Sequence, residues 1–340
     1  MSAEQLKSVI HKVSTGAPLE RNEMRTALDA MMSGVATPAQ MGAFLMAMRV
    51  RGETIEEITG AAEFMRARMT TVEAPPGTID IVGTGGDSHG TFNVSTCSAL
   101  VAAGAGAKVA KHGNRSVSSK SGASDVLAAL GVKLEIAPEA IAHCIDQAGV
   151  GFMWAPMHHA AMKHWAPIRA ELGIRTIFNV LGPICNPANV KRQIVGVYAA
   201  DLVKPIANVL NNLGSEHVWV VHGHDSMDEM TTTGATTIAE LKGGKINVFE
   251  VTPADAGLLP AKMSDLIGGD ASVNADAIRR VLDGNREPFR DIVVLNAGAA
   301  LVVAGLVADL RSGVEAAATA IDNGSAKQVL ARLVEVSNAA

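Results

Sequence analysis

The sequence predicts an α/β protein with two parts: a small N-terminal all-α domain and a large α/β domain whose mostly parallel central sheet is covered by helices. The first seventy residues carry helix signals throughout. After Pro75-Pro76-Gly77, short apolar runs alternate with longer helical segments, the pattern of parallel strands joined by crossover helices. We therefore expect a helical domain over residues 1–74, joined by part of 160–190, and an α/β domain over residues 75–340.

Two capping boxes begin helices in the first domain. Thr37-Pro38-Ala39-Gln40 supplies a capping hydroxyl, a proline at the first helical position and a glutamine three residues after the cap. Thr54-Ile55-Glu56-Glu57 repeats this arrangement. Residues 41–50 lie between them and are apolar on most sides, so we expect this helix to be buried, either in the domain's own core or against a partner subunit.

The second domain alternates between the two kinds of element. We expect strands at 78–82, 108–110, 151–154, 194–198, 217–221 and 246–251, and helices at 94–105, 124–130, 137–148, 157–172, 202–213, 275–282 and 326–336. Residues 292–308 are almost wholly apolar, but aspartates bracket them and Asn296 interrupts them. We therefore expect a buried strand at 292–295 followed by a packed helix, not a membrane span.

Composition and charge exclude several classes of protein. Of the 340 residues, 48% are hydrophobic and 19% charged, which excludes disorder as the dominant state. Aromatic residues make up 3%, so the core must be aliphatic. The formal net charge of −5 argues against a nucleic-acid binder, which needs a broad basic face, but allows a small anionic ligand held by local donors.

The cysteines and the N-terminus bear on the compartment. Cys97, Cys144 and Cys185 are odd in number and widely spaced, so neither a disulfide framework nor a zinc site fits. The N-terminus lacks the basic and apolar segments of a signal peptide. We expect a cytoplasmic protein without a membrane partner.

A glycine-rich loop, Gly83-Thr84-Gly85-Gly86-Asp87, directly follows the first predicted strand. Such a loop lets backbone N–H groups approach a ligand at the carboxyl end of a strand. It is not a dinucleotide fingerprint, because Ser88 stands where the third glycine belongs, and it lacks the Gly-Lys-Ser/Thr of a Walker A loop. On its own it is equally compatible with a tight turn.

Two polar segments strengthen the case for an anionic ligand. Residues 91–96 open the next helix with an excess of amide and hydroxyl groups, although capping by Asn93 or Ser95 needs just one of them. Residues 111–119 gather two cations, an imidazole, an amide and several hydroxyls around a glycine. A solvated loop is the alternative, but a loop folding over an anionic, hydroxylated ligand would use all of these groups.

Further polar residues suggest a metal site and a carboxylate site. The adjacent carboxylates of Asp228-Glu229, close to the proposed phosphate sites, suit magnesium. A paired general acid and base is a less economical interpretation of the same residues. An Asp-Glu pair considered alone is usually just a solvated charge run. His158, His159 and His164 lack the spacing of a zinc enzyme, so they are expected on a polar helix face or lining a pocket. Arg169 and Arg175 are each able to pair with a substrate carboxylate or to satisfy a helix end.

These motifs resemble, in their order, those of the anthranilate phosphoribosyltransferase family. The match covers nearly the whole chain and includes residues 83–87, 93–96, 111–119, 157–159, 175–179, 181–183, 186–187 and 228–232. The resemblance implies transfer of the phosphoribosyl group of 5-phospho-α-D-ribose 1-diphosphate (phosphoribosyl pyrophosphate) to anthranilate, giving N-(5-phosphoribosyl)anthranilate and pyrophosphate, the second step of tryptophan biosynthesis from chorismate. It also implies a requirement for Mg²⁺, the fold of pyrimidine nucleoside phosphorylases, and a homodimer formed through the helical domain.

The resemblance also assigns site residues. It places the following around phosphoribosyl pyrophosphate: Gly83, Gly86, Asp87, Thr91, Asn93, Ser95, Thr96, Lys111, Ser119 and Ala123. It places Gly83, Asn114 and Arg169 around anthranilate, with His112, His159 and Gly182 lining the approach. It makes Ser95, Asp228 and Glu229 the magnesium ligands. Residues 121–125 exchange alanine and serine relative to the family's usual order, which puts a side-chain contact at Ala123 in doubt and leaves Ser124 as its substitute.

The chemistry requires no acid or base residue. Pyrophosphate must leave the anomeric carbon, and magnesium and Lys111 can neutralise its developing charge. The amine of anthranilate is unprotonated at neutral pH, so positioning by Arg169 and Asn114 should carry most of the acceleration. We expect charge stabilisation and alignment without a covalent intermediate.

Two alternative functions compete with this one. A pyrimidine nucleoside phosphorylase-like enzyme would use phosphate as the nucleophile without obligatory magnesium, and Asp228-Glu229 disfavours it. A non-catalytic nucleic-acid-binding relative should show a basic groove and eroded loops, whereas here the net charge is −5 and each loop motif is intact.

Overall fold

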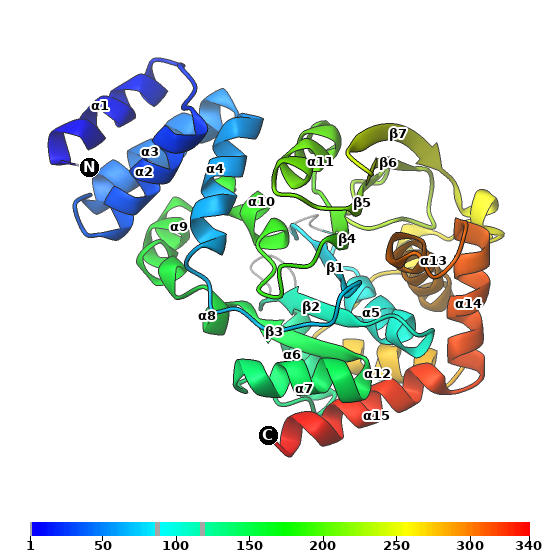
Figure 1. The fold of residues 1–340 in the computed structure, drawn as a ribbon. Helices are drawn as coiled ribbons and strands as arrows, with labels where there is room; N and C mark the ends of the chain where they lie inside the picture. The colour runs from blue at the N-terminus through cyan, green and yellow to red at the C-terminus, as the bar shows by residue number, and fades with distance from the viewer. Residues whose placement is uncertain (1, 86–88, 116–119) are drawn as a thin grey trace.

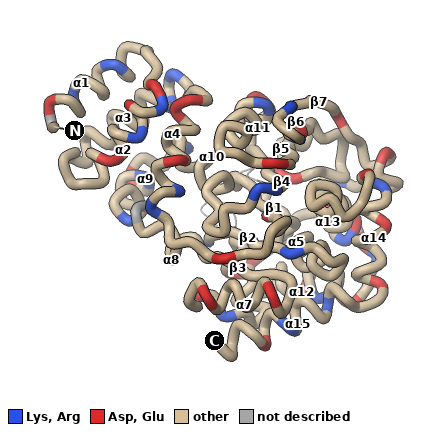
Figure 2. Tube along the Cα trace, viewed as in Figure 1, with Lys and Arg blue, Asp and Glu red and all other residues tan. Residues whose placement is uncertain are grey.

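A computed structural model of the chain describes residues 2–85, 89–115 and 120–340 (Figure 1). It has a helical part that contains the N-terminus and an α/β part that ends on the C-terminal helix. This is the predicted fold class. Figure 2 shows that acidic and basic residues are intermingled along the chain in both parts.

The helical part begins with four helices: α1 (Ala3–Ser14), α2 (Arg21–Met32), α3 (Pro38–Arg51) and α4 (Ile55–Arg66). Both predicted capping boxes are present. Thr37 Oγ accepts from the Gln40 N–H at 3.3 Å and Gln40 Oε1 accepts from the Thr37 N–H at 2.9 Å, and Thr54 and Glu57 form the same pair of bonds. Two later helices, α9 (Ala166–Leu172) and α10 (Ile177–Ile184), pack against α3, and α10 also packs against α4.

The α/β part is built on one seven-stranded sheet. Its strands are β1 (Ile79–Gly83), β2 (Val109–Gly113), β3 (Val150–Trp154), β4 (Arg192–Gly196), β5 (His217–Gly223), β6 (Thr236–Lys242) and β7 (Lys245–Val251). The spatial order is β3-β2-β1-β4-β5-β6-β7. The strands from β3 to β5 are parallel, and β6 and β7 are antiparallel additions at one edge.

Helices cover both faces of this sheet (Figure 1). The helices outside the helical part are α5 (Val94–Gly104), α6 (Ala123–Ala129), α7 (Pro138–Ala148), α11 (Val203–Asn212), α12 (Ala271–Leu282), α13 (Pro288–Ala304), α14 (Leu310–Asp322) and α15 (Ser325–Asn338), together with the short helix α8 (Ala155–His158) that directly follows β3. Alternate strand residues enter two cores, as the two-residue period of a strand requires. Ile81 and Ile194 join the core beneath α5 and α13, whereas Val82 and Val195 join a second core that continues into the helical part.

Two sequence predictions of secondary structure were wrong. Residues 292–295 are not a strand but lie within α13, which is buried on nearly every side. A short apolar run buried all round has the same hydrophobic pattern in a strand and in a helix. Residues 157–172 are not one helix but α8, a 3₁₀ turn (Ala160–His164) and α9. Pro167 lies in the first turn of α9, where its missing N–H is tolerated, and it prevents a continuous helix through this point.

Candidate active site

The candidate site lies at the carboxyl ends of β1 and β4. The sheet order places β2 on one side of β1 and β4 on the other, so this edge is a topological switch point, where open α/β sheets bind ligands. Gly83 at the end of β1 is in register with Gly196 at the end of β4. A Cβ atom on Gly83 would lie 2.4 Å from Asp228 Oδ2, and one on Gly196 would lie 1.5 Å from the Asp228 backbone oxygen. Two glycines therefore make room for the loop that follows β5.

This approach brings two separately predicted motifs together. The Asp228 carboxylate, on a residue that is 6% exposed, accepts a hydrogen bond from the Gly85 N–H at 2.5 Å. The glycine loop is itself fixed to the sheet, because the Thr84 N–H donates to Gly196 O at 3.0 Å and Thr84 Oγ accepts from the Tyr198 N–H at 3.0 Å. The acidic pair and the glycine loop thus form one edge of the site.

Lys111 on β2 is buried beside the same edge. Its Nζ donates to Ile81 O at 2.7 Å and to Ser95 Oγ at 3.2 Å. Burial lowers the pKa of the ammonium group, while Asp80 and Glu229 act in the opposite direction. The lysine therefore links a predicted magnesium ligand, Ser95, to β1 and lies within electrostatic reach of another, Glu229.

A buried acid lies behind Lys111, and the sequence reasoning did not find it. Asp80 on β1 is fully buried, and burial raises the pKa of its carboxyl to about 6 although Lys111 opposes this. Its oxygens accept from the His112 N–H at 3.3 Å and from Asn186 Nδ2 at 2.7 Å. Asn186 Nδ2 also donates to Ala110 O at 2.9 Å. An acidic residue inside an otherwise apolar strand was the signal that could have revealed this network.

The start of α5 faces the same region, and the first of its backbone donors, the Val94 N–H, bonds to Phe92 O at 2.8 Å. Asn93 is the N-cap residue, but its side chain makes no capping hydrogen bond to the helix. It donates to Ser121 O at 3.4 Å and accepts from Asn274 Nδ2 at 2.8 Å. Thr96 Oγ is buried and has no hydrogen-bond partner among the described residues. Capping therefore does not account for the polar residues at this helix start, and an anion could accept from its N–H groups.

The residues predicted to contact anthranilate come from two parts of the chain: the ends of β1 and β2, and the segment that runs from α8 to α10. The Arg169 guanidinium on α9 is 5.5 Å from the ring centroid of Phe178, and burial lowers its pKa with no carboxylate of the described chain acting on it. The rings of His112 and His159 are buried with centroids 5.0 Å apart. Burial lowers the pKa of His159 to about 4, and burial and the neighbouring histidines lower that of His112 well below its usual range. Both rings are therefore neutral at physiological pH.

The other predicted residues have less distinctive surroundings. Thr91 forms an isolated bridge with Ile267, and Ala123 is the first residue of α6. Asn114 is exposed, and its Oδ1 accepts from the Arg115 N–H at 2.8 Å. Gly182 faces open space, since a Cβ there would meet no atom within 4 Å. Gly86, Asp87 and Ser119 lie outside the described residues.

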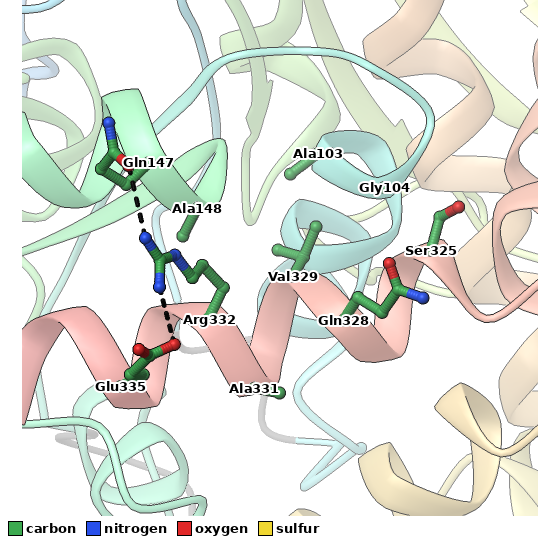
Figure 3. Close-up of a pocket in the computed structure, with 10 residues that line it drawn as sticks. All are labelled: Ala103, Gly104, Gln147, Ala148, Ser325, Gln328, Val329, Ala331, Arg332 and Glu335. Carbon is green, nitrogen blue, oxygen red and sulfur yellow. Dashed lines mark hydrogen bonds and ion pairs between the residues drawn. The ribbon is translucent and has the colours of Figure 1, made fainter.

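The structure also bears on a groove away from the candidate site, on the clustering of metal-binding side chains and on the length of the apolar helices. A groove of about 590 Å³ lies between the carboxyl ends of α5 and α7 and helix α15 (Figure 3), at the end of α5 opposite the candidate site. Its charged side chains are paired, since Arg332 bonds to Glu335 and Gln147. In the described part of the chain, no three His, Cys, Asp or Glu side chains gather as a metal site. Within the same residues, no helix is long and apolar enough to cross a membrane.

Comparison with known proteins gives the family. Two family models match, "Glycosyl transferase family, helical bundle domain" over residues 7–69 and "Glycosyl transferase family, a/b domain" over residues 75–327. Anthranilate phosphoribosyltransferase of Rhodopseudomonas palustris (strain BisA53) is 59% identical over 334 residues, covering 98% of each chain. The same enzyme of Parvibaculum lavamentivorans is 60% identical over 332 residues, covering 98% of this chain and 97% of the relative.

Solved structures agree with this assignment. The crystal structure of anthranilate phosphoribosyltransferase from Thermus thermophilus superposes with a TM-score of 0.92 at 39% identity, covering 99% of this chain and 100% of that one. The Saccharomyces cerevisiae enzyme in complex with phosphoribosyl pyrophosphate and magnesium superposes with a TM-score of 0.89 at 28% identity, covering 98% of both chains. A glycine loop, a buried lysine and an acidic pair that meet at one switch point, together with these full-length similarities, show that the chain is an enzyme of the anthranilate phosphoribosyltransferase family.

Proposed function

We propose that this chain transfers the phosphoribosyl group of phosphoribosyl pyrophosphate to anthranilate, releasing pyrophosphate and forming N-(5-phosphoribosyl)anthranilate for tryptophan biosynthesis. The observation that supports it most directly is the contact between the Gly85 N–H and the Asp228 carboxylate, which joins the glycine loop to the acidic pair at the switch point. Relatives of this name align over nearly the full chain. A yeast relative has been solved with 4-fluoroanthranilate.

The phosphate groups would lie between the glycine loop, the start of α5 and Lys111. The N–H groups at the start of α5 favour negative charge, and Lys111 adds a cation held by Ile81 and Ser95. We place the sugar and its phosphates against Gly83, Thr91, Asn93, Ser95, Thr96 and Lys111, with Gly86, Asp87, Ser119 and Ala123 as further proposed contacts. Developing charge on the leaving pyrophosphate is stabilised by Lys111 without proton transfer.

The residues present suit magnesium. Ser95, Asp228 and Glu229 offer a hydroxyl and two carboxylates, the oxygen donors that this ion prefers, alongside substrate phosphates. When bound, the ion would supply positive charge for the diphosphate leaving group. A yeast relative of this family has been solved with phosphoribosyl pyrophosphate and magnesium. We infer that Ser95, Asp228 and Glu229 hold the ion in this chain.

Anthranilate would enter on the side of the helical part. The Arg169 guanidinium has no carboxylate partner among the described residues, so it is available to bind the anthranilate carboxylate. The neutral rings of His112 and His159, with Gly182 and Asn114, line the route without adding charge. The aromatic amine needs no strong base, so these residues act by aligning it with the anomeric carbon.

We further propose a division of the chain at residues 74 and 75, a homodimer through the helical part, and a cytoplasmic location. Met46 and Val50 on α3 are 38% and 79% exposed, which suits an apolar contact with a second copy. The three cysteines are free and buried, as suits a reducing compartment.

The first test measures loss of anthranilate fluorescence in the presence of phosphoribosyl pyrophosphate, with Mg²⁺ and with EDTA. We expect a loss that depends on Mg²⁺ and on both substrates. An unchanged signal with folded enzyme at high concentration would contradict the proposal. Cleavage of pyrimidine nucleosides by inorganic phosphate, without a metal requirement, would favour the phosphorylase alternative instead.

A further inference from the structure

A buried amide side chain interrupts the apolar helix α13. Asn296 is fully buried, and a buried amide needs hydrogen-bond partners for both its ends. Its Nδ2 donates to Ile292 O in its own helix at 2.9 Å and to Met230 O at 2.8 Å. Its Oδ1 accepts from the Met230 N–H at 3.0 Å. One side chain therefore binds both backbone groups of a residue 66 positions away.

This double contact lies directly after the acidic pair. Met230 follows Asp228 and Glu229 in the chain, and its own side chain is fully buried in the core beneath α13. A residue held at its N–H, its C=O and its side chain is restrained in both position and orientation. The backbone on the C-terminal side of the acidic pair is therefore held by α13.

The other end of the pair is fixed from within the loop itself. Asp225 accepts from the Met227 N–H at 3.1 Å and from Thr231 Oγ at 2.5 Å, and also from the Thr233 hydroxyl. The Gly223 N–H donates to Met227 O at 2.9 Å. These bonds shape the loop, but they tie it to nearby residues of its own chain segment. Asn296 ties the loop to a helix that packs against β1, β4 and β5.

We propose that Asn296 is a positioning residue that acts through Met230 to place Asp228 and Glu229 for a divalent cation. The inference rests on the proposed function, because it requires the acidic pair to hold the metal. Groups that orient the ligands of a metal change its affinity about 10- to 100-fold when they are removed, since ligand oxygens must lie within a few tenths of an ångström of their positions. Asn296 touches no substrate in this proposal and influences the reaction through the loop alone.

Direct metal binding tests the inference without using enzyme turnover. Mn²⁺ serves as the probe, titrated into the full-length protein in the presence of inorganic pyrophosphate and followed by electron paramagnetic resonance. Asn296→Leu keeps the branched shape of the side chain but removes both bonds to Met230, and we expect it to raise the Mn²⁺ dissociation constant about 10- to 100-fold. Asn296→Ser supplies a hydroxyl that can still donate to Ile292 O in its own helix but is too short to reach Met230. If the leucine variant does not fold, the same loss of Mn²⁺ affinity is expected in this serine variant.

Ser98→Ala is the matched control. Ser98 on α5 is fully buried and its hydroxyl donates to Val293 O of α13 at 3.1 Å, so its removal also costs a buried hydrogen bond to this helix. That bond does not involve the acidic loop, and we expect the Mn²⁺ affinity of the variant to equal that of the unmodified protein. Unchanged Mn²⁺ affinity in a folded Asn296 variant would overturn the inference about Asn296 but not the proposed function. An equal loss of Mn²⁺ affinity in Ser98→Ala would do the same. Unmodified protein that binds no Mn²⁺ with pyrophosphate would overturn the metal assignment on which it rests.

Discussion

Gly196→Ala tests whether the close approach of the acidic loop to β4 is required for activity. The added Cβ would lie 1.5 Å from the Asp228 carbonyl oxygen and 2.4 Å from its carbonyl carbon. Ordinary van der Waals contact begins at 3.4 Å, so the carbonyl must retreat by about 1.9 Å. The obstacle is backbone and not a flexible side chain, so rotation about a side-chain bond cannot relieve it.

Two losses should follow from this displacement. Overpacking at a filled site costs about 1–3 kcal/mol of unfolding free energy. A misplacement of about 1 Å in a catalytic group can cost about 100-fold in rate, so we expect kcat/KM to fall by at least that factor, or about 2.7 kcal/mol of transition-state stabilisation. The bond from the Gly85 N–H to Asp228 should also weaken, because the donor stays in the glycine loop that follows β1 while the acceptor moves.

The assay combines initial rates for both substrates with urea unfolding. Gly234→Ala is the control, since Gly234 lies in the same loop but a Cβ there would meet no atom within 4 Å. We expect this control to retain activity within about threefold of the unmodified protein. Folded Gly196→Ala protein with activity equal to that of the control would refute the argument that β4 sets the position of the acidic pair.

Two further predictions concern other parts of the site. Arg169→Ala should raise KM for anthranilate about 10- to 100-fold and change KM for phosphoribosyl pyrophosphate by less than about twofold, because charge-assisted bonds to the carboxylate are lost. Arg169→Lys should restore only part of the affinity for anthranilate, because an ammonium group keeps the positive charge but cannot bind a carboxylate bidentately. Equal changes in both KM values would contradict the assignment of Arg169 to the anthranilate carboxylate. The folded-state pKa of Asp80, about 6, lies above its reference value of 3.8, so this carboxyl lowers stability as the pH rises through that window, by about 3 kcal/mol in total. Between about pH 4 and about pH 7, urea unfolding should therefore show Asp80→Asn gaining about 2 kcal/mol of this total relative to the unmodified protein. Parallel pH profiles for the two proteins would count against a buried, charged Asp80.

The parallel core of the sheet was predictable because each strand there is a short apolar run followed by a turn or a ligand loop. β1 and β5 begin within a residue of the predicted positions. β6 was missed, although Gly243-Gly244, both with positive φ, mark a two-residue hairpin between it and β7. α14 was also missed.

The candidate site was predictable in its motifs but not in its geometry. The sequence motifs indicate a glycine loop, a basic segment and an acidic pair, and the structure brings Gly85 to Asp228 and Lys111 to Ser95. Asn296 was visible as a polar interruption, yet its partner Met230 belongs to another element, and no local pattern joins the two. Contacts of this kind depend on which elements the fold brings together.

The late position of α13 in the chain has a consequence for synthesis. All seven strands have been translated by residue 251, but the helix that covers the middle of the sheet spans residues 288–304. Until α13 leaves the ribosome, the side chains of Ile81, Ile194 and Val221 lack that part of their cover. A nascent chain at this stage exposes apolar sheet surface and has no Asn296 to hold the acidic loop. A premature stop before residue 288 therefore releases an aggregation-prone fragment, not an enzyme of reduced activity.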